Sequence, residues 1–409
     1  MTVTTDVLVV GGGATGAGVV RDLATRGVDV TLVERGGLGS GTSGRSHGLL
    51  HSGARYAESD ARGAEECLEE NETLRDIARA CIRDTGGLVV QLAEDDPEYF
   101  EAKRTACEEI GIPAETLSGE AARESVPDLA GDVERVMHVP DAVIYPSRLV
   151  AANAADARDH GATIHTHAPV EDVSRDGESV TSVTVGGSVD DTIEANYVVN
   201  ATGAWAGEFA AMAGIDVAMQ PNRGVMVSVE YEGLGPVLNR CRDPDDGDIV
   251  VPHDDEVVLG TTSVDVDDPD DYDTAEWEVE KSIEECAAML PPVADATHVR
   301  TWWGIRPLYA PDEQARGGRG ISRGFFLLDH GTDGVENMAS VVGGKLTTYR
   351  QMAEATADLV CEDIGVDADC TTADERLPHV DDPTRLDALV AEFDGHGPTD
   401  EDIVAAETP

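Results

Sequence analysis

The amino-acid sequence predicts a protein of the α/β and α+β classes, with two interleaved domains. A strand, a glycine-rich turn, a helix and a second strand follow one another within residues 6–35. Strand, turn and helix patterns of the same kind return at 197–214 and 340–360. Between these two, residues 215–300 carry alternating strand-like pieces, which is typical of an inserted mixed or antiparallel sheet domain.

The N-terminal unit carries the clearest pattern. The apolar run at 6–10 ends in glycines and predicts a buried parallel strand. Residues 16–27 have helical spacing and finish with Gly27, a typical helix stop, and 29–35 predict the next strand. This βαβ unit indicates a Rossmann-like domain.

The remaining elements divide the chain. Helical patterning covers about 62–83, a new strand begins near 86, and an acidic helix over about 98–110 indicates the insertion of a second domain. A helix is also expected near 384–393. We therefore assign 1–85, 146–214 and 301–360 to the Rossmann-like domain, 86–145 and 215–300 to the second domain, and 361–409 to an acidic C-terminal extension.

The charge of the chain is extreme. Its 409 residues include 81 acidic and 29 basic side chains, a formal net charge of -52, with only three lysines. At roughly 1 M salt the Debye length falls to about 3 Å, which screens such self-repulsion, so the composition indicates a halophilic protein. A nucleic acid or an anionic membrane is not expected as a direct partner, because binding either needs a basic face.

Cysteine usage and hydropathy narrow the class further. Seven cysteines are present and none forms Cys-x-x-Cys, so we expect no zinc site, no iron–sulfur cluster and no other metal site. This usage fits a reduced, cytoplasmic setting. The first residues lack the basic segment of a signal peptide, and no run of about 18 apolar residues is present to span a membrane.

The first motif is GGGATG, in which Gly11, Gly13 and Gly16 satisfy G-x-G-x-x-G. Such glycines permit a tight turn and let a pyrophosphate approach the N-terminus of the helix. Glu34 ends the next strand, where a carboxylate accepts hydrogen bonds from a ribose. The alternative is a glycine turn without a ligand, which the strand before it and the helix after it disfavour.

The second motif, GLGSGTSGRSHGLLHSGARY at 37–56, favours FAD over NAD. Its small residues suit a segment that lies along an extended cofactor, where hydroxyls and amides bond to pyrophosphate and flavin atoms. An NAD site does not need such a segment.

Two further glycine turns belong to the predicted site. NATGAWAG at 200–207 implies backbone packed closely on a bulky group, and its alternative is an ordinary strand-to-helix turn. GGKLTTYR at 343–350 places Lys345 at a helix start, and its alternative is a solvated surface lysine. Arg306 and Arg323 suit a phosphate or carboxylate, although either could form a salt bridge on so acidic a protein.

In combination, VVGGGATGAG, TSGRSHGLLHSGARY, NATGAW, GIRPL, SRGFF and GGKLTTYR resemble FAD-dependent glycerol-3-phosphate dehydrogenases of the D-amino-acid-oxidase superfamily. SGRSHGLLHSGARY is closest to the catalytic A subunit of the anaerobic type, and the acidic, lysine-poor background is similar to a haloarchaeal member. The resemblance covers roughly 1–360. It implies a p-hydroxybenzoate-hydroxylase-like architecture, in which the first domain holds extended FAD and the second caps the flavin.

The resemblance also implies site residues. The family's substrate pocket matches Arg55, Tyr56, Arg306, Arg323 and Lys345 in this sequence. The residues expected to bind FAD are Gly11, Gly13, Ala14, Thr15, Gly16, Glu34, Arg35, Thr42, Ser43, Ser46, His47, Gly48, Leu50, Ser52, Val170, Ala201, Thr202, Gly203, Gly344, Lys345, Leu346 and Thr347.

The reaction implied is oxidation of sn-glycerol 3-phosphate to dihydroxyacetone phosphate, with hydride passing from C2 to flavin N5. His51 matches the histidine beside the flavin's reactive edge and is the expected base, since a histidine pKa near 6.5 suits proton transfer around neutral pH. The alternative is that His51 only hydrogen-bonds the flavin. Arg306 and Lys345 are expected near the C2 oxygen, and Arg323 at the phosphate.

Rival functions keep the fold. A 2-hydroxyacid dehydrogenase, such as one acting on L-2-hydroxyglutarate, or an amine-oxidising enzyme would place a carboxylate on the same arginines. A flavoprotein subunit with mainly an assembly role is a rival of a different class, and an NAD-dependent dehydrogenase is a third.

The resemblance further implies partner subunits of the B and C type, for electron transfer and membrane anchoring, or a quinone-linked acceptor. Attachment to the cytoplasmic membrane would then be peripheral, through those subunits. The anaerobic A subunits usually continue into a cysteine-bearing domain suited to an iron–sulfur cluster. This sequence reaches Pro409 without such a cluster, so a truncated chain and a short variant are both open expectations.

Overall fold

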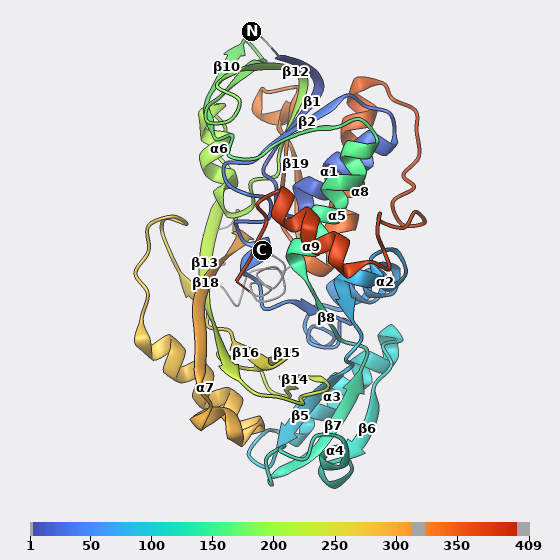
Figure 1. The fold of residues 1–409 in the computed structure, drawn as a ribbon, viewed down its shortest axis with the longest axis vertical. Helices are drawn as coiled ribbons and strands as arrows, with labels where there is room; N and C mark the ends of the chain where they lie inside the picture. The colour runs from blue at the N-terminus through green and yellow to red at the C-terminus, as the bar shows by residue number, and fades with distance from the viewer. Residues whose placement is uncertain (1–2, 312–323, 399–409) are drawn as a thin grey trace.

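A computed structural model describes residues 3–311 and 324–398, in which two sheet domains follow one another along the long axis of the molecule (Figure 1). The upper domain in this view contains β1 (Val3–Val10) and α1 (Ala14–Thr25). The lower domain contains β5 (Gly87–Leu92) and α7 (Glu276–Met289). The α/β and α+β prediction is confirmed.

The first sheet has a parallel core in the order β9-β2-β1-β12-β20, with antiparallel strands at its margins. Its other strands in the described ranges are β2 (Val30–Val33), β9 (Thr163–His165), β10 (Val170–Asp176), β11 (Ser179–Val185), β12 (Asp191–Asn200), β19 (Phe325–Asp329) and β20 (Met338–Gly343).

The second half of β1, residues 7–10, is apolar, and both of its faces are covered. Val7 and Val9 join a core cluster with the helices of one face, whereas Leu8 and Val10 join a second cluster on the other. Fully buried parallel strands read as continuous apolar runs for this reason. The first face is covered by α1, α5 (Pro146–Asp159) and α8 (Tyr349–Ile364), and the second by α6 (Ala206–Met212).

The second sheet is largely antiparallel, with one parallel pair between β5 and β14. Figure 1 shows its strands β13 and β18 running from the upper domain into the lower one. Its further strands are β6 (Glu115–Ser118), β7 (Val133–Val139), β13 (Met219–Glu230), β14 (Val237–Arg240), β15 (Ile249–His253), β16 (Glu256–Gly260), β17 (Val264–Asp265) and β18 (His298–Tyr309).

Smaller elements complete the two domains. A short sheet joins the glycine-rich segment after β2 to the beginning and the end of the insertion. The strands of this sheet are β3 (Leu49–Leu50), β4 (Ile82–Arg83) and β8 (Ala142–Ile144). The remaining helices of this part of the chain are α2 (Ala61–Ile77), α3 (Pro97–Ile110) and α4 (Gly119–Ser125).

Two features differ from what the sequence patterns predicted. The register of β18 with β13 runs from His298 to Tyr309, so residues 301–309 lie in the second sheet rather than in the first domain. Helix α7 occupies a region where only strand-like pieces were expected. Its buried face is Glu278, Ser282, Cys286 and Met289, and the two polar residues hide the helical periodicity.

The C-terminal segment packs on the first domain. Helix α9 (Pro383–Glu392) lies against α5, close to the expected range of 384–393. Leu386, Leu389, Val390 and Phe393 belong to the same core cluster as β1 and α1. In the described part of the chain, no helix is long and apolar enough to cross a membrane.

Candidate active site

A cavity of about 510 Å³ is lined by residues of both domains, a size typical of small-molecule and cofactor sites. The first domain contributes its glycine turns, and the second contributes β13, Thr261 and β18. Of the predicted site residues, the structure brings to this cavity Gly11, Gly13, Ala14, Thr15, Glu34, Arg35, Thr42, Ser43, Ser46, His47, His51, Tyr56, Val170, Ala201, Thr202, Gly203, Arg306, Gly344, Lys345 and Leu346.

The three motif glycines have different tasks. Gly11 has φ +107°, and a Cβ there would lie 2.5 Å from the Ala201 carbonyl oxygen. A Cβ on Gly16 would lie 1.9 Å from the Gly11 oxygen, so these two glycines permit the turn to pack on itself and on β12. Gly13 faces the cavity, where a Cβ would meet only Ser43 Oγ, at 3.2 Å.

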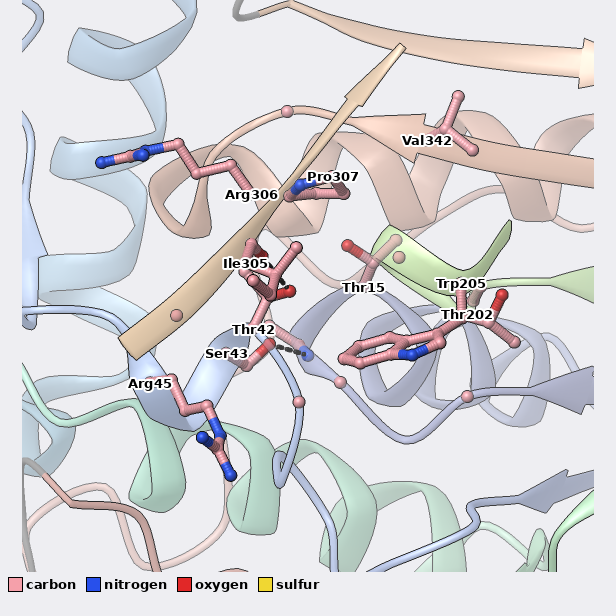
Figure 2. Close-up of a pocket in the computed structure, with 18 of the residues that line it drawn as sticks. Thr15, Thr42, Ser43, Arg45, Thr202, Trp205, Ile305, Arg306, Pro307 and Val342 are labelled. Atoms are coloured by element: carbon pink, nitrogen blue, oxygen red, sulfur yellow. Dashed lines mark hydrogen bonds between the residues drawn. The ribbon is translucent and has the colours of Figure 1, made fainter. Parts of the chain in front are cut away.

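Helix α1 presents its N-terminus to the cavity. Its N-cap residue, Gly13, offers no side-chain cap, and its first turn contains no acidic residue. Ser43 Oγ accepts a hydrogen bond from the Ala14 N–H at 2.9 Å, drawn as a dashed line in Figure 2. The remaining first-turn amides and the positive end of the helix dipole form a place for an anionic group such as a pyrophosphate.

Glu34 and Arg35 line the cavity after β2. Both oxygens of Glu34 accept backbone hydrogen bonds, from Gly12 at 2.7 Å and Gly36 at 2.8 Å, which fixes the carboxylate at the glycine turn. Arg35 lies 4.2 Å above the Trp205 ring and forms two hydrogen bonds with Asp270, at 2.7 and 2.8 Å. This pairing holds the pKa of Asp270 below its usual value.

The Asn-Ala-Thr-Gly turn is fixed by Asn200, which is fully buried. Its Nδ2 donates to Ser340 Oγ at 3.0 Å and to the Ala206 carbonyl at 2.9 Å. Its Oδ1 accepts from the Thr202 hydroxyl at 2.7 Å. Asn200 therefore orients the turn whose next three residues line the cavity.

The segment after β2 bridges the domains beside the cavity. Thr42 Oγ1 donates to the Ile305 carbonyl on β18 at 2.6 Å, and Trp302 Nε1 donates to the Arg45 carbonyl at 3.2 Å. Figure 2 shows Thr42 and Ser43 on one side of Thr15, with Trp205 on the other.

Three predicted residues from two segments of the chain meet at the cavity. The His51 and Tyr56 rings have centroids 5.2 Å apart, with the Tyr56 hydroxyl 3.5 Å from His51 Nε2. Lys345 Nζ lies 4.6 Å from the centre of the Tyr56 ring. His51 is held through its backbone, since its N–H donates to Thr347 Oγ1 and its carbonyl accepts from Asn71 Nδ2, both at 3.1 Å.

Arg306 enters the cavity from β18. Its guanidinium donates to Asn222 Oδ1 at 2.6 Å, to Thr261 Oγ1 at 3.1 Å and to the Thr262 carbonyl at 2.8 Å. These three acceptors are neutral, and they orient the guanidinium. Lys345 and Arg306 thus bring cationic groups to the cavity of an acidic protein.

Some predicted residues are not among the described residues that line the cavity. Arg55 lines a separate small pocket and forms a 3.4 Å ion pair with Asp248, so the structure does not bring it to the cavity that Tyr56 lines. Ser52 is buried and donates to Asp141. Gly16, Gly48, Leu50 and Thr347 are likewise not among the described lining residues. Arg323 lies outside the described residues.

Several lining residues were not predicted from the sequence. Trp205 belongs to the NATGAWAG motif, and its position directly after the glycine turn could have indicated that it lines the cavity. Met226 and Thr261 carried no signal, because the second sheet brings them to the cavity from strands without a glycine motif. Arg45 lies between Ser43 and Ser46 and lines the cavity as well.

These residues fit FAD. The remaining amides at the N-terminus of α1 suit a pyrophosphate, and Glu34 suits a ribose. The glycine, serine and threonine residues of the lining leave room for backbone to approach a flat ring. Fold and cavity together define a two-domain dinucleotide-binding oxidoreductase.

Comparison with known proteins agrees with this class. Residues 6–350 match the DAO family, described as FAD dependent oxidoreductase. The chain is 51% identical over 402 residues to the A1 subunit of the anaerobic glycerol-3-phosphate dehydrogenase of Haloferax volcanii, covering 95% of this chain and 68% of that protein. It is 42% identical over 387 residues to the A subunit of the Escherichia coli K12 enzyme, covering 93% and 71%.

Solved structures share the fold. Glycine oxidase from Geobacillus kaustophilus has a TM-score of 0.75 at 23% identity, covering 92% of this chain and 99% of that one. Glycerol-3-phosphate dehydrogenase from Bacillus halodurans, complexed with FAD, has a TM-score of 0.70 at 23% identity, covering 98% and 76%. The chain therefore belongs to the FAD-dependent oxidoreductases, and within them to the family of the A subunits of anaerobic glycerol-3-phosphate dehydrogenases.

Proposed function

We propose that this chain oxidises sn-glycerol 3-phosphate to dihydroxyacetone phosphate. The observation that carries the proposal is the meeting of His51, Tyr56, Lys345 and Arg306 at a cavity built for FAD, in a chain whose relatives are named for this substrate. When bound, the flavin would accept the hydride that leaves C2.

The protein's part is to position the substrate and to move a proton. His51 accepts the proton of the C2 hydroxyl, and the backbone bonds to Thr347 and Asn71 hold it in place. Tyr56 lies beside His51 Nε2 and orients the ring. Lys345 and Arg306 stabilise the negative charge that develops on the C2 oxygen.

The phosphate needs cationic partners as well. A phosphate monoester carries about -1.5 to -2 charges at pH 7, which is costly to bring to a protein of net charge -52 unless the pocket is locally basic. Arg323, which the sequence motif indicated, remains our proposed phosphate ligand.

The acceptor of the flavin's electrons is proposed from the relatives of this chain. The two relatives above are A subunits of multi-subunit enzymes. We propose that electrons pass to electron-transfer and membrane-anchor subunits of the B and C type, or to a quinone-linked acceptor, and that the chain works in the cytoplasm or at the membrane through those subunits.

Anaerobic mixing of the FAD-loaded protein with glycerol 3-phosphate, 2-hydroxyglutarate or glycine tests the substrate. We expect flavin absorbance to bleach with glycerol 3-phosphate and His51→Gln to slow bleaching by about 10²- to 10⁴-fold, the range for a lost general base. Bleaching by another compound instead would reject the substrate, and bleaching by none would favour an assembly role. An unchanged rate in His51→Gln would show that His51 only holds the flavin.

A further inference from the structure

Part of the C-terminal segment packs against the loop that lines the cofactor cavity, although the sequence indicated an extension outside the FAD domain. The loop comprises residues 36–44, which lead from Glu34 and Arg35 to Thr42 and Ser43. The part of the segment that meets this loop comprises residues 393–397, which follow α9. The two run against each other through backbone atoms.

Close glycine contacts define this interface. The Leu38 N–H donates to the Phe393 carbonyl at 3.2 Å. A Cβ on Gly37 would lie 1.6 Å from the Asp394 carbonyl oxygen, and one on Gly397 would lie 2.7 Å from the Gly44 oxygen. A Cβ on Gly395 would lie 2.9 Å from the Leu38 oxygen. A side chain at any of these positions would force the two backbones apart.

An unusual pair of residues extends the contact to a second cavity segment. Asp394 and His167 are non-glycine residues with positive φ, at +48° and +53°, and they pair with each other at 2.9 Å. Such conformations cost free energy and persist where the surrounding structure determines them. His167 precedes Ala168, Pro169 and Val170, which line the cavity, and its N–H donates to the Gly36 carbonyl at 2.9 Å.

The rest of the segment is anchored independently of the cavity. Arg148 and Asp387, both buried, form two hydrogen bonds at 2.6 and 2.8 Å. The fully buried Arg21 donates to the Glu375 carbonyl at 2.8 Å. These contacts tie the segment to the first domain without involving the cofactor loop.

We infer that residues 393–397 are a positioning segment of the FAD site, which holds the 36–44 loop and the 167–170 segment in the conformation that binds the cofactor. The loop reaches the glycine turn through the Gly39 N–H, which donates to the Gly12 carbonyl at 2.8 Å, so a displaced loop would also move the pyrophosphate end. The inference rests on the FAD dependence of the family and not on the proposed substrate.

The test is titration of the apoprotein with FAD, followed by flavin fluorescence in high salt. We expect Gly37→Ala to raise the Kd for FAD by about tenfold or more, and Gly397→Ala and Gly395→Ala by about threefold, in the order of their contact distances. Gly131→Ala is the matched control, because a Cβ there meets nothing within 4 Å. Its Kd should stay within about twofold.

A second comparison separates positioning from general loss of stability. Asp387→Asn breaks the remote anchor, so it should lower the apoprotein Tm while leaving the FAD Kd within about threefold. Gly397→Ala should instead raise the FAD Kd while leaving the apoprotein Tm nearly unchanged. FAD binding by Gly37→Ala and Gly397→Ala as tight as by Gly131→Ala would overturn the inference, and so would equal weakening by Asp387→Asn. No step of the test uses glycerol 3-phosphate, so its outcome is independent of the substrate assignment.

Discussion

At the level of single residues, Arg306 allows the effect of a positive charge to be separated from the effect of its exact position. Its guanidinium is held by Asn222, Thr261 and Thr262 at once, which a lysine ammonium cannot reproduce because it lacks the planar fork.

Arg306→Lys should therefore lower kcat/KM for glycerol 3-phosphate by about 10²-fold, as expected for one or two charge-assisted hydrogen bonds. Steady-state kinetics with a dye acceptor measures the effect, and the FAD Kd serves as the control. Full activity in the lysine variant would mean that only charge matters at this position.

His253 links the second sheet to the cofactor segment and makes stability depend on pH. It is buried beside Gly48 and the His47 carbonyl, and burial lowers its pKa to about 4, from an ordinary value near 6.5. Between these two pKa values His253 is protonated in the unfolded chain and neutral in the folded chain. The free energy of unfolding is therefore highest above pH 6.5 and decreases as the pH falls from 6.5 to 4.

Between pH 7 and pH 5 the wild type should lose about 2 kcal/mol more unfolding free energy than His253→Gln, given that pKa difference. Urea unfolding of both proteins in about 2 M KCl at each pH measures it. The many carboxylates titrate in both proteins and cancel in the comparison. Equal losses would show that His253 is not neutral in the folded protein.

At the scale of elements, the turn between β1 and α1 separates a folding task from a binding task. Gly16 packs on the Gly11 carbonyl, whereas Gly13 faces the cavity. Both glycines belong to the same motif, so the sequence alone does not show which one serves folding and which one serves binding.

We expect Gly16→Ala to destabilise the apoprotein by about 3 kcal/mol or more, in the range of severe overpacking. Gly13→Ala should leave the apoprotein Tm nearly unchanged and weaken FAD binding by at least about tenfold, because its Cβ would occupy the approach of the pyrophosphate. Thermal melts and FAD titrations of both variants test this separation. A loss of Tm in Gly13→Ala matching that in Gly16→Ala would contradict it.

For the whole molecule, the net charge of -52 sets the solvent that the fold needs. Arg148 and Arg350 form buried ion pairs with Asp387 and Glu70, so these two positive charges do not offset the acidic surface. The Debye length grows from about 3 Å at 1 M to about 10 Å at 0.1 M, so repulsion returns on dilution.

Thermal melts in KCl from about 2 M down to about 0.1 M should show the Tm falling by about 10 °C or more. A fall of this size corresponds to several kcal/mol of repulsion, because a change of 1 kcal/mol shifts the Tm by about 2–4 °C for domains of 150–250 residues. A sucrose series at constant low salt is the control for water activity. A Tm independent of KCl would show that the acidic surface does not govern stability.

The βαβ unit, the cofactor motifs and the small residues expected around FAD could all be predicted from the amino-acid sequence. These are local features, since a glycine spacing or an apolar run reports on backbone within one or two elements. His51, Tyr56 and Lys345 could be proposed from their motifs, because each stands beside a glycine turn.

Contacts between the two domains could be identified only in the folded protein. Asn222, Met226 and Thr261 reach the site through the pairing of β13 with β16 and β18, and no local pattern records that register. The same holds for Arg55, which its motif placed with the substrate and which Asp248 draws to another pocket. It holds too for residues 393–397, whose contacts with Gly37 and Gly44 join positions far apart in the chain. Contacts at such separation depend on packing between whole elements, which is why composition and spacing could not supply them.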